Sequence, residues 1–196
     1  MSENSVKEKS LQLSKENKIK FNLSSLIRIK DLYQLFEEEI KDDDYDYSQH
    51  FKNGSEQLTE FADYVFSRVF TGNGLDLSDI ERFNALDGLA PEDNEYSSYQ
   101  AAIAVNIVLI ATNIIKIAKG EEAKIKSTID YTLDVINNLK SEEFFTNNPD
   151  GDDDEGEEYL EQFYDQEISA EDKLINSIDN ISQNDFISFN EENMIN

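Results

Sequence analysis

The sequence predicts an all-α protein, a single compact helical domain of about six to seven helices around a buried central helix. Apolar residues recur at spacings of three and four along most of the chain, which is the pattern of helices with one buried face. Only two prolines and seven glycines occur among the 196 residues, so few positions would interrupt a helix. We expect the domain to span residues 21–182, between a polar N-terminal arm at residues 1–20 and a C-terminal tail at residues 183–196.

The first half of this domain is expected to contain three helices. The first covers residues 23–40 and ends in an acidic run. The second and clearest begins at Ser55, a candidate N-cap, and ends before Gly72. Ser78 followed by Glu81 matches a capping box and predicts a short third helix. The second helix keeps the helical repeat throughout, with apolar residues at Leu58, Phe61, Ala62, Val65, Phe66, Val69 and Phe70.

Residues 101–118 form the most apolar stretch and are predicted to be the central helix, buried on nearly all sides. Its length reaches the lower limit for crossing a bilayer, but polar residues interrupt it and its flanks are acidic, so a transmembrane span is disfavoured. Asn106 and Asn113 lie on one face of this helix. We expect them to form a polar seam bonded to neighbouring helices, and a pocket lining is the alternative.

The second half of the domain is expected to alternate helices with an acidic loop. Gly120 precedes a fifth helix, which Asn148-Pro149 would end. Residues 150–158 are dominated by acidic residues and glycine and predict a mobile loop. Aromatic residues at 159–164 suggest a helix after this loop, and Ser169 with Asp172 is a cap pattern for the last helix.

Three segments carry a resemblance to a known family. The stretch Leu89-Ala90-Pro91-Glu92-Asp93-Asn94-Glu95-Tyr96-Ser97-Ser98-Tyr99-Gln100-Ala101-Ala102 leads into the central helix, Gly120-Glu121 opens the next helix with Ser127, Thr128 and Leu133, and Asn148-Pro149 is followed by acidic residues. This order resembles the YjaG-like bacterial family, domain of unknown function 416, over residues 21–180. The chain departs from the family in having no tryptophan and no closing Gly-Ser-Asn-Ile-Gly stretch. The resemblance implies a compact all-α domain and brings no activity.

The charge of the chain is large and unevenly distributed. The formal net charge is −26, from 43 acidic and 17 basic residues. Residues 31–100 carry a net charge of −14 and residues 141–196 carry −17, whereas residues 1–30 carry +4. Such self-repulsion opposes a compact fold, so we expect the negative charge to serve a function, which is to attract a basic partner. Direct binding to nucleic acid or to an anionic membrane is disfavoured, because phosphate attraction needs clustered lysine and arginine.

Little in the sequence points to catalysis or to a metal. The chain has no cysteine and one histidine, His50, which we expect to be exposed in a loop. A zinc site or a serine triad is therefore disfavoured, because too few ligand and base residues are present. An EF-hand loop starting at Asp150 would place Asp152, Asp154 and Glu161 correctly but has Glu155 where the turn needs glycine. We therefore expect no cofactor, no metal and no enzymatic activity, and a carboxylate- or metal-dependent hydrolase is the weakest alternative.

Two acidic and aromatic segments are the candidate partner-binding sites. Carboxylates pair with arginine in a bidentate manner, and tyrosine rings accept cations. The alternative is that both segments are only a solvated coat. The candidate residues are Asp42, Asp43, Asp44, Tyr45, Asp46 and Tyr47 in the first segment, and Asp152, Asp153, Asp154, Glu157, Glu158, Tyr159 and Asp165 in the second.

These observations favour an acidic binding protein that neutralises a basic protein partner. The most concrete form is an immunity protein that blocks a bacterial nuclease toxin, because negative charge speeds association with a cationic cleft. The alternative is a YjaG-like housekeeping or regulatory domain that self-associates into a homo-oligomer. The N-terminal lysines are followed by no run of apolar residues, so we expect no secretory signal and a cytoplasmic location.

Overall fold

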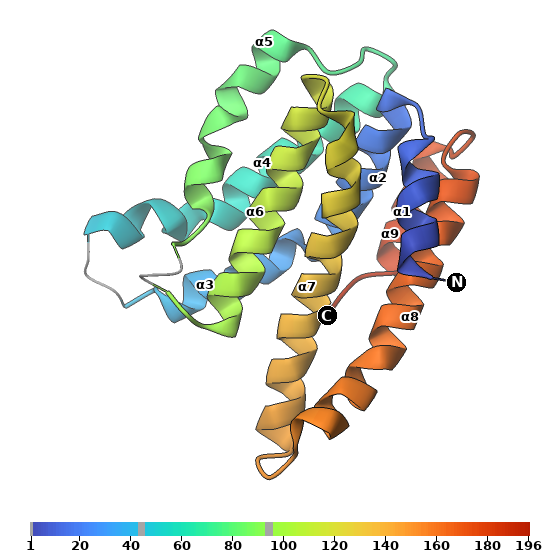
Figure 1. Cartoon of the computed structure of the whole chain (residues 1–196). Helices are drawn as coiled ribbons and strands as arrows, with labels where there is room; N and C mark the ends of the chain where they lie inside the picture. Colours follow the sequence, from blue (N-terminus) through green and yellow to red (C-terminus); the bar gives the residue numbers. More distant parts are fainter. Residues whose placement is uncertain (1, 43–45, 93–95) are drawn as a thin grey trace.

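The chain folds into an all-α domain, as the sequence predicts (Figure 1). The structure, a computed structural model, describes residues 2–42, 46–92 and 96–196, and within these ranges it contains no strand. Short 3₁₀ segments connect several helices: η1 (Lys30–Leu32), η2 (Asp46–Asn53), η3 (Glu81–Leu89) and η4 (Glu122–Lys124). The α-helices are α1 (Glu3–Leu11), α2 (Lys15–Ile29), α3 (Tyr33–Glu39), α4 (Gly54–Phe70), α5 (Leu77–Ile80), α6 (Tyr99–Ala118), α7 (Ile125–Asn147), α8 (Asp153–Ser177) and α9 (Gln183–Glu192).

The central helix is α6, which confirms the prediction from its apolar sequence. It packs against α2, α3, α7 and η3, and Ile103, Ile107 and Ile114 are fully buried. The Ser98 side chain caps the helix by accepting a hydrogen bond from the Ala101 backbone N–H at 3.0 Å. By length and composition α6 is the one helix of the described residues that could cross a membrane, but 72% of its apolar window is buried inside the domain.

Asn113 of α6 belongs to a polar seam with neighbouring helices, as predicted, whereas the prediction is wrong for Asn106. Asn113 donates from Nδ2 to Thr128 Oγ1 of α7 at 3.1 Å and to the Lys124 carbonyl at 3.3 Å. Thr128 in turn donates to Asn22 of α2. Asn106 donates to the Ala102 carbonyl of its own helix at 3.0 Å. The seam ties α2, α6 and α7 together because buried polar groups need partners.

The N-terminal arm is helical and belongs to the domain, so the prediction of a polar arm at residues 1–20 is wrong. Residues 3–11 form α1, and α2 begins at Lys15 after Ser14, whose side chain accepts a hydrogen bond from the Asn17 backbone N–H. Val6 and Ile19 are buried in the core. The prediction failed because α1 has only two apolar residues, Val6 and Leu11, and is held mainly by ion pairs to distant residues.

Two local predictions in the first half also need correction. The helix expected at residues 23–40 is divided by η1 into α2 and α3. The short helix after α4 is opened by Asp76, which accepts hydrogen bonds from the backbone and side chain of Ser78, so the expected capping box is absent there. The predicted second helix is confirmed as α4, but it begins at Gly54 with Asn53 at the N-cap position, so the predicted cap at Ser55 is wrong. Gly72 follows the helix at a φ of 72°, which favours glycine.

The largest correction concerns the acidic segment after residue 150. It is not a loop: α8 begins at Asp153 and continues without a break to Ser177, through the position of the expected cap at Ser169. The tail from residue 183 is likewise helical, as α9, with Phe186 fully buried. A short turn joins α7 to α8, and the two helices run side by side away from the rest of the domain (Figure 1). This hairpin positions the candidate site.

Candidate acidic binding groove

A groove lined with carboxylates runs between α7 and α8. It consists of two adjacent hollows, with volumes of about 560 Å³ and about 470 Å³, that share Glu161 and Tyr164 in their walls. The first hollow lies near the start of α8, and the second lies where α1 meets α7 and α8. We refer to the two together as the acidic groove. Its acidic residues are Glu3, Asp130, Asp134, Asp154, Glu157, Glu158, Glu161 and Asp165.

The α8 wall of the groove follows from helical spacing. Side chains three and four residues apart share a helix face, so a run that is almost all acidic must place several carboxylates in one line. The run is helical rather than a loop because Asp152 caps it, accepting a hydrogen bond from the Glu155 backbone N–H at 3.0 Å. Asp153 and Asp154 stand in the first turn, where the helix dipole favours negative charge. The same charges thus stabilise the helix start and line the groove.

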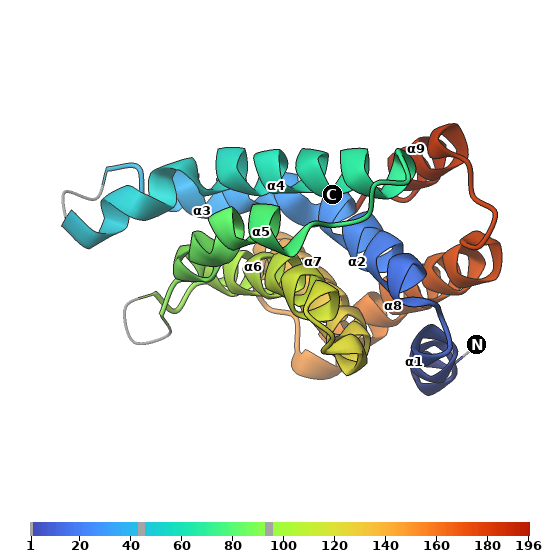
Figure 2. The same ribbon diagram turned by 90° about the horizontal axis from the view of Figure 1, so that it is seen from above.

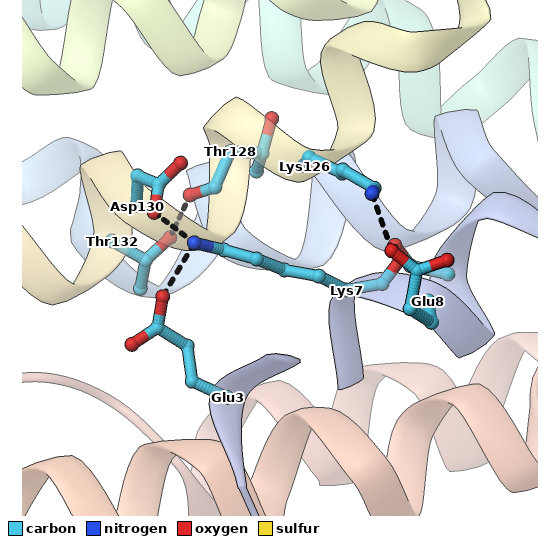
Figure 3. Close-up of polar contacts among 8 residues, drawn as sticks. Glu3, Lys7, Glu8, Lys126, Thr128, Asp130 and Thr132 are labelled. Carbon is cyan, nitrogen blue, oxygen red and sulfur yellow. Dashed lines mark hydrogen bonds and ion pairs between the residues drawn. The ribbon is translucent and has the colours of Figure 1, made fainter. Parts of the chain in front are cut away.

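The opposite wall comes from α7 and α1. Asp130 and Asp134 are one turn apart on α7, and Glu3 projects from α1. Neither hollow is lined by a lysine or an arginine among the residues that the structure describes. The nearby cation Lys7 of α1 forms ion pairs with Glu3 and Asp130 at the edge of the groove (Figure 3). Most carboxylates of the groove therefore face water without a cation.

Burial and the carboxylates of the groove shift the pKa of two groups that line it, Asp134 and Tyr164. Burial, Asp130 and Glu3 together raise the pKa of Asp134 above its ordinary value. Burial, Asp134 and Glu3 likewise raise the pKa of the Tyr164 phenol. Both shifts disfavour a further negative charge, and the same field attracts a cation. The groove is therefore suited to lysine or arginine side chains, with Tyr164 available as an aromatic surface.

The structure brings together part of the second predicted segment. Asp154, Glu157, Glu158 and Asp165 line the groove. Asp152 is the cap of α8 and does not line it.

Two other predicted residues also lie off the groove. Asp153 is exposed and is not among its lining residues. Tyr159 points to another face, where its ring lies 5.4 Å from Phe144 and its hydroxyl donates to Glu143 at 3.1 Å. The acidic-aromatic motif thus divides between two faces of α8.

Sequence reasoning missed the residues that complete the groove. Glu161 and Tyr164 lie in the same run of α8, and their spacing from Glu157 and Glu158 was a usable signal. The spacing of Asp130 and Asp134 on one face of α7 was a second signal. No local signal could have placed Glu3 there, because α1 reaches the groove only through the tertiary fold.

The first predicted segment stays a prediction. Asp42 is exposed in a turn after α3. Asp43, Asp44 and Tyr45 lie outside the described residues, and the side chains of Asp46 and Tyr47 at the start of η2 are outside them as well.

No described residues form a metal centre. In the part of the chain that the structure describes, no group of three or more histidine, aspartate or glutamate side chains is arranged to hold a metal ion. His50 is exposed, as expected, with its ring centroid 3.8 Å from that of Phe51.

A second acidic cluster lies on the face of α8 that packs on the domain. The Arg28 guanidinium of α2 donates from Nη1 and Nη2 to the two oxygens of Glu167, each at 2.6 Å. Glu171, one turn further along α8, is fully buried and its two carboxylate oxygens have no hydrogen-bond donor. Burial and the neighbouring Glu167 raise the pKa of Glu171 well above its ordinary value, against the opposing effect of Arg28. One arginine thus faces two buried carboxyls, and the charged form of Glu171 is disfavoured.

The fold of this chain also occurs in a solved structure. It is similar to the crystal structure of a DUF416 family protein from Shewanella baltica OS155, with a TM-score of 0.63 and 13% sequence identity. The likeness covers 95% of this chain and 92% of that chain. No family model and no curated protein matches the sequence. The chain therefore shares the fold of a DUF416 family protein, which confirms the resemblance in sequence at the level of the fold.

Proposed function

We propose that this protein binds a basic protein partner and neutralises it, with the acidic groove receiving the partner's lysine and arginine side chains. The observation that carries the proposal is the groove itself: eight carboxylates line two adjacent hollows, and no lysine or arginine of the described residues lies in their walls. Unpaired carboxylates in a concave site concentrate the negative potential, which steers a cationic surface and speeds its association.

The most concrete form of this proposal is an immunity protein that blocks the basic active site of a bacterial nuclease toxin in the cytoplasm. Arginine-rich and lysine-rich clefts that bind phosphates would also bind a row of carboxylates. The protein would act by occupying the cleft and would catalyse no reaction. It would contact neither nucleic acid nor membrane, because its net charge of −26 repels both.

The test is neutralisation of the groove. In the quadruple variant Asp154→Asn, Glu157→Gln, Glu158→Gln and Glu161→Gln, we expect association with a synthetic arginine- and lysine-rich peptide to slow by about tenfold or more at low salt, with a smaller effect on dissociation. Stopped-flow fluorescence gives both rates. Raising the salt from about 0.02 M to about 0.5 M should remove most of the difference.

A matched control separates the groove from net charge alone. Four exposed carboxylates elsewhere, Glu56, Glu81, Asp87 and Glu92, can be neutralised for the same change in charge. If this control slows association as much as the groove variant does, the groove is not the binding site. The immunity form is tested by coexpression with the product of a neighbouring toxin gene, where the parent chain should protect cells and the groove variant should not.

The second candidate function is a non-enzymatic YjaG-like housekeeping or regulatory domain that self-associates, and the shared fold with a DUF416 family protein favours it. In that case the acidic groove would be incidental. Light scattering after size-exclusion chromatography distinguishes the two, because a stable homo-oligomer that salt does not affect would support this candidate and a monomer that binds the basic peptide would support the first.

A further inference from the structure

Helix α1, like α9, buries few of its residues against the domain. It lies against α7 and α8 at the edge of the molecule (Figures 1 and 2). Of its nine residues only Val6 and Ser10 are buried, whereas α6 buries thirteen. Because burial of apolar surface is the main stabilising term in folding, α1 belongs to the least stable part of the structure.

A set of ion pairs holds α1 in place together with the buried side chain of Val6. Lys7 pairs with Asp130 of α7 as well as with Glu3, and Glu8 accepts a hydrogen bond from Lys126 at 2.6 Å (Figure 3). Lys9 donates to Asp172 of α8 at 2.7 Å. These pairs are partly exposed, and such pairs contribute little and are screened by salt. The attachment of α1 should therefore weaken as the ionic strength rises.

Lys7 and Lys9 of α1 pair with carboxylates that would otherwise be available to the lysine or arginine side chains of a basic partner. Lys7 neutralises Asp130, which lines the acidic groove, and Lys9 neutralises Asp172 further along α8. A short helix carrying two lysines thus sits between carboxylates of α7 and of α8. Any other basic helix laid in the same position would find the same two carboxylates available for its lysine or arginine side chains.

We propose that α1 is a displaceable cover of Asp130 and Asp172, at the edge of the acidic groove, and that a basic helix of the protein partner takes its place on α7 and α8. The partner's lysine or arginine side chains would replace Lys7 at Asp130 and Lys9 at Asp172. Only Gln12, Leu13 and Ser14 separate α1 from α2, and Ser14 caps α2, so rotation at Gln12 would move α1 while the cap stays in place. The inference rests on the proposed function, because it names the competitor that the partner must displace.

The cover lowers the affinity for a partner. If only the open form binds a basic helix at these positions, the observed affinity equals that of the open form multiplied by the fraction of molecules that are open. Weakening the ion pairs of α1 should therefore strengthen partner binding, although the substitutions remove contacts from the protein. A purely structural helix would give the opposite result or none.

The first measurement requires no partner. Hydrogen–deuterium exchange of the α1 amides is compared with that of α2 amides at about 0.02 M and about 0.5 M salt. We expect exchange in α1 to rise by about tenfold with salt, and by a similar factor at low salt in the double variant Lys7→Gln, Lys9→Gln, whereas α2 stays protected. Equal protection of α1 under all these conditions would overturn the proposal.

The second measurement uses an amphipathic lysine-leucine helical peptide as the probe. The Lys7→Gln, Lys9→Gln variant should bind this peptide about tenfold more tightly than the parent chain by fluorescence anisotropy. The matched control is Lys30→Gln, Lys41→Gln, which changes the net charge equally at two lysines paired with Asp31 and Glu38 away from the groove. An equal gain in this control would show a general charge effect and would overturn the proposal.

The outcomes separate this inference from the proposed function. If the peptide binds the parent chain and the groove variant weakens it, but the Lys7 and Lys9 substitutions do not strengthen it, the proposed function stands and the cover is refuted. If the peptide binds none of the proteins at low salt, the proposed function and the cover fail together.

Discussion

Two faces of α8 carry carboxylates in opposite environments. On the groove face, Glu157 and Glu161 line an open hollow without a cation. On the face that packs against α2, Glu167 is bound by Arg28 through two hydrogen bonds of 2.6 Å, and Glu171 is buried without a donor. The same residue type on the same helix is therefore a solvated charge in one place and part of a buried ion cluster in the other.

The difference shows which acidic residues can act on a partner. A solvated carboxylate keeps its charge at neutral pH and contributes to a field that extends over about a Debye length, roughly 8 Å in physiological salt. A buried carboxyl either pairs with a cation or takes up a proton. Most of the net charge is thus available for association, whereas the Arg28 cluster affects the stability of the fold.

The largest expected effect is on the buried cluster. Arg28→Met leaves Glu167 and Glu171 buried without their cation, so it should lower the free energy of unfolding by about 3–5 kcal/mol in urea titrations monitored by circular dichroism. The triple variant Arg28→Met, Glu167→Leu, Glu171→Leu removes the charges together and should regain most of that loss. If the single and triple variants are equally unstable, lost packing and not the uncompensated charge is responsible.

The second-largest expected effect is an increase in the free energy of unfolding. Glu171→Gln replaces a buried acid with a neutral amide that can donate to Glu167, and should raise the free energy of unfolding at pH 7 by about 1–2 kcal/mol.

The pH dependence of the Glu171 variant follows from the raised pKa of Glu171. Below its ordinary value of 4.5 the carboxyl is protonated in both the folded and the unfolded state. Above 4.5 the unfolded state releases the proton first, so the parent chain loses stability as the pH rises toward the folded pKa. The gain in Glu171→Gln should therefore be absent near pH 4 and grow above pH 4.5, and a gain that did not change with pH would contradict this origin.

A smaller loss is expected at the start of α8. Asp152→Ala removes the cap that accepts a hydrogen bond from the Glu155 backbone N–H and should cost about 1 kcal/mol of unfolding free energy. Asp153→Ala is the matched control, because Asp153 is exposed and caps nothing. Equal effects of the two substitutions would mean that first-turn charge, not the cap, stabilises this helix.

The smallest effect on stability is expected in the groove. The quadruple groove variant should change the free energy of unfolding by less than about 1 kcal/mol, because the removal of like charges that repel one another offsets the lost first-turn charge of Asp154. A marked destabilisation would show that these carboxylates hold the fold together and would remove the contrast between the two faces of α8.

Much of the fold follows from the sequence because helical periodicity is a local signal. The apolar repeats of α4 and α6 and the turn at Gly120 were predicted close to their observed positions. The acidic start of α8 was predicted as a loop because composition was weighed above the cap at Asp152 and the helix dipole. The arm was missed because α1 has too few apolar residues to reveal a buried face.

By itself, the sequence determined that this protein is helical, that residues 101–118 form its centre, and that it carries a large excess of negative charge. Only the tertiary structure decided which carboxylates gather in the groove, which are buried, and which hold α1. The reason is distance along the chain: spacings of three and four residues define a helix face, whereas Arg28 meets Glu167 across 139 positions and Lys7 meets Asp130 across 123. Whether a charge is paired depends on contacts of that kind, and they exist only in the folded chain.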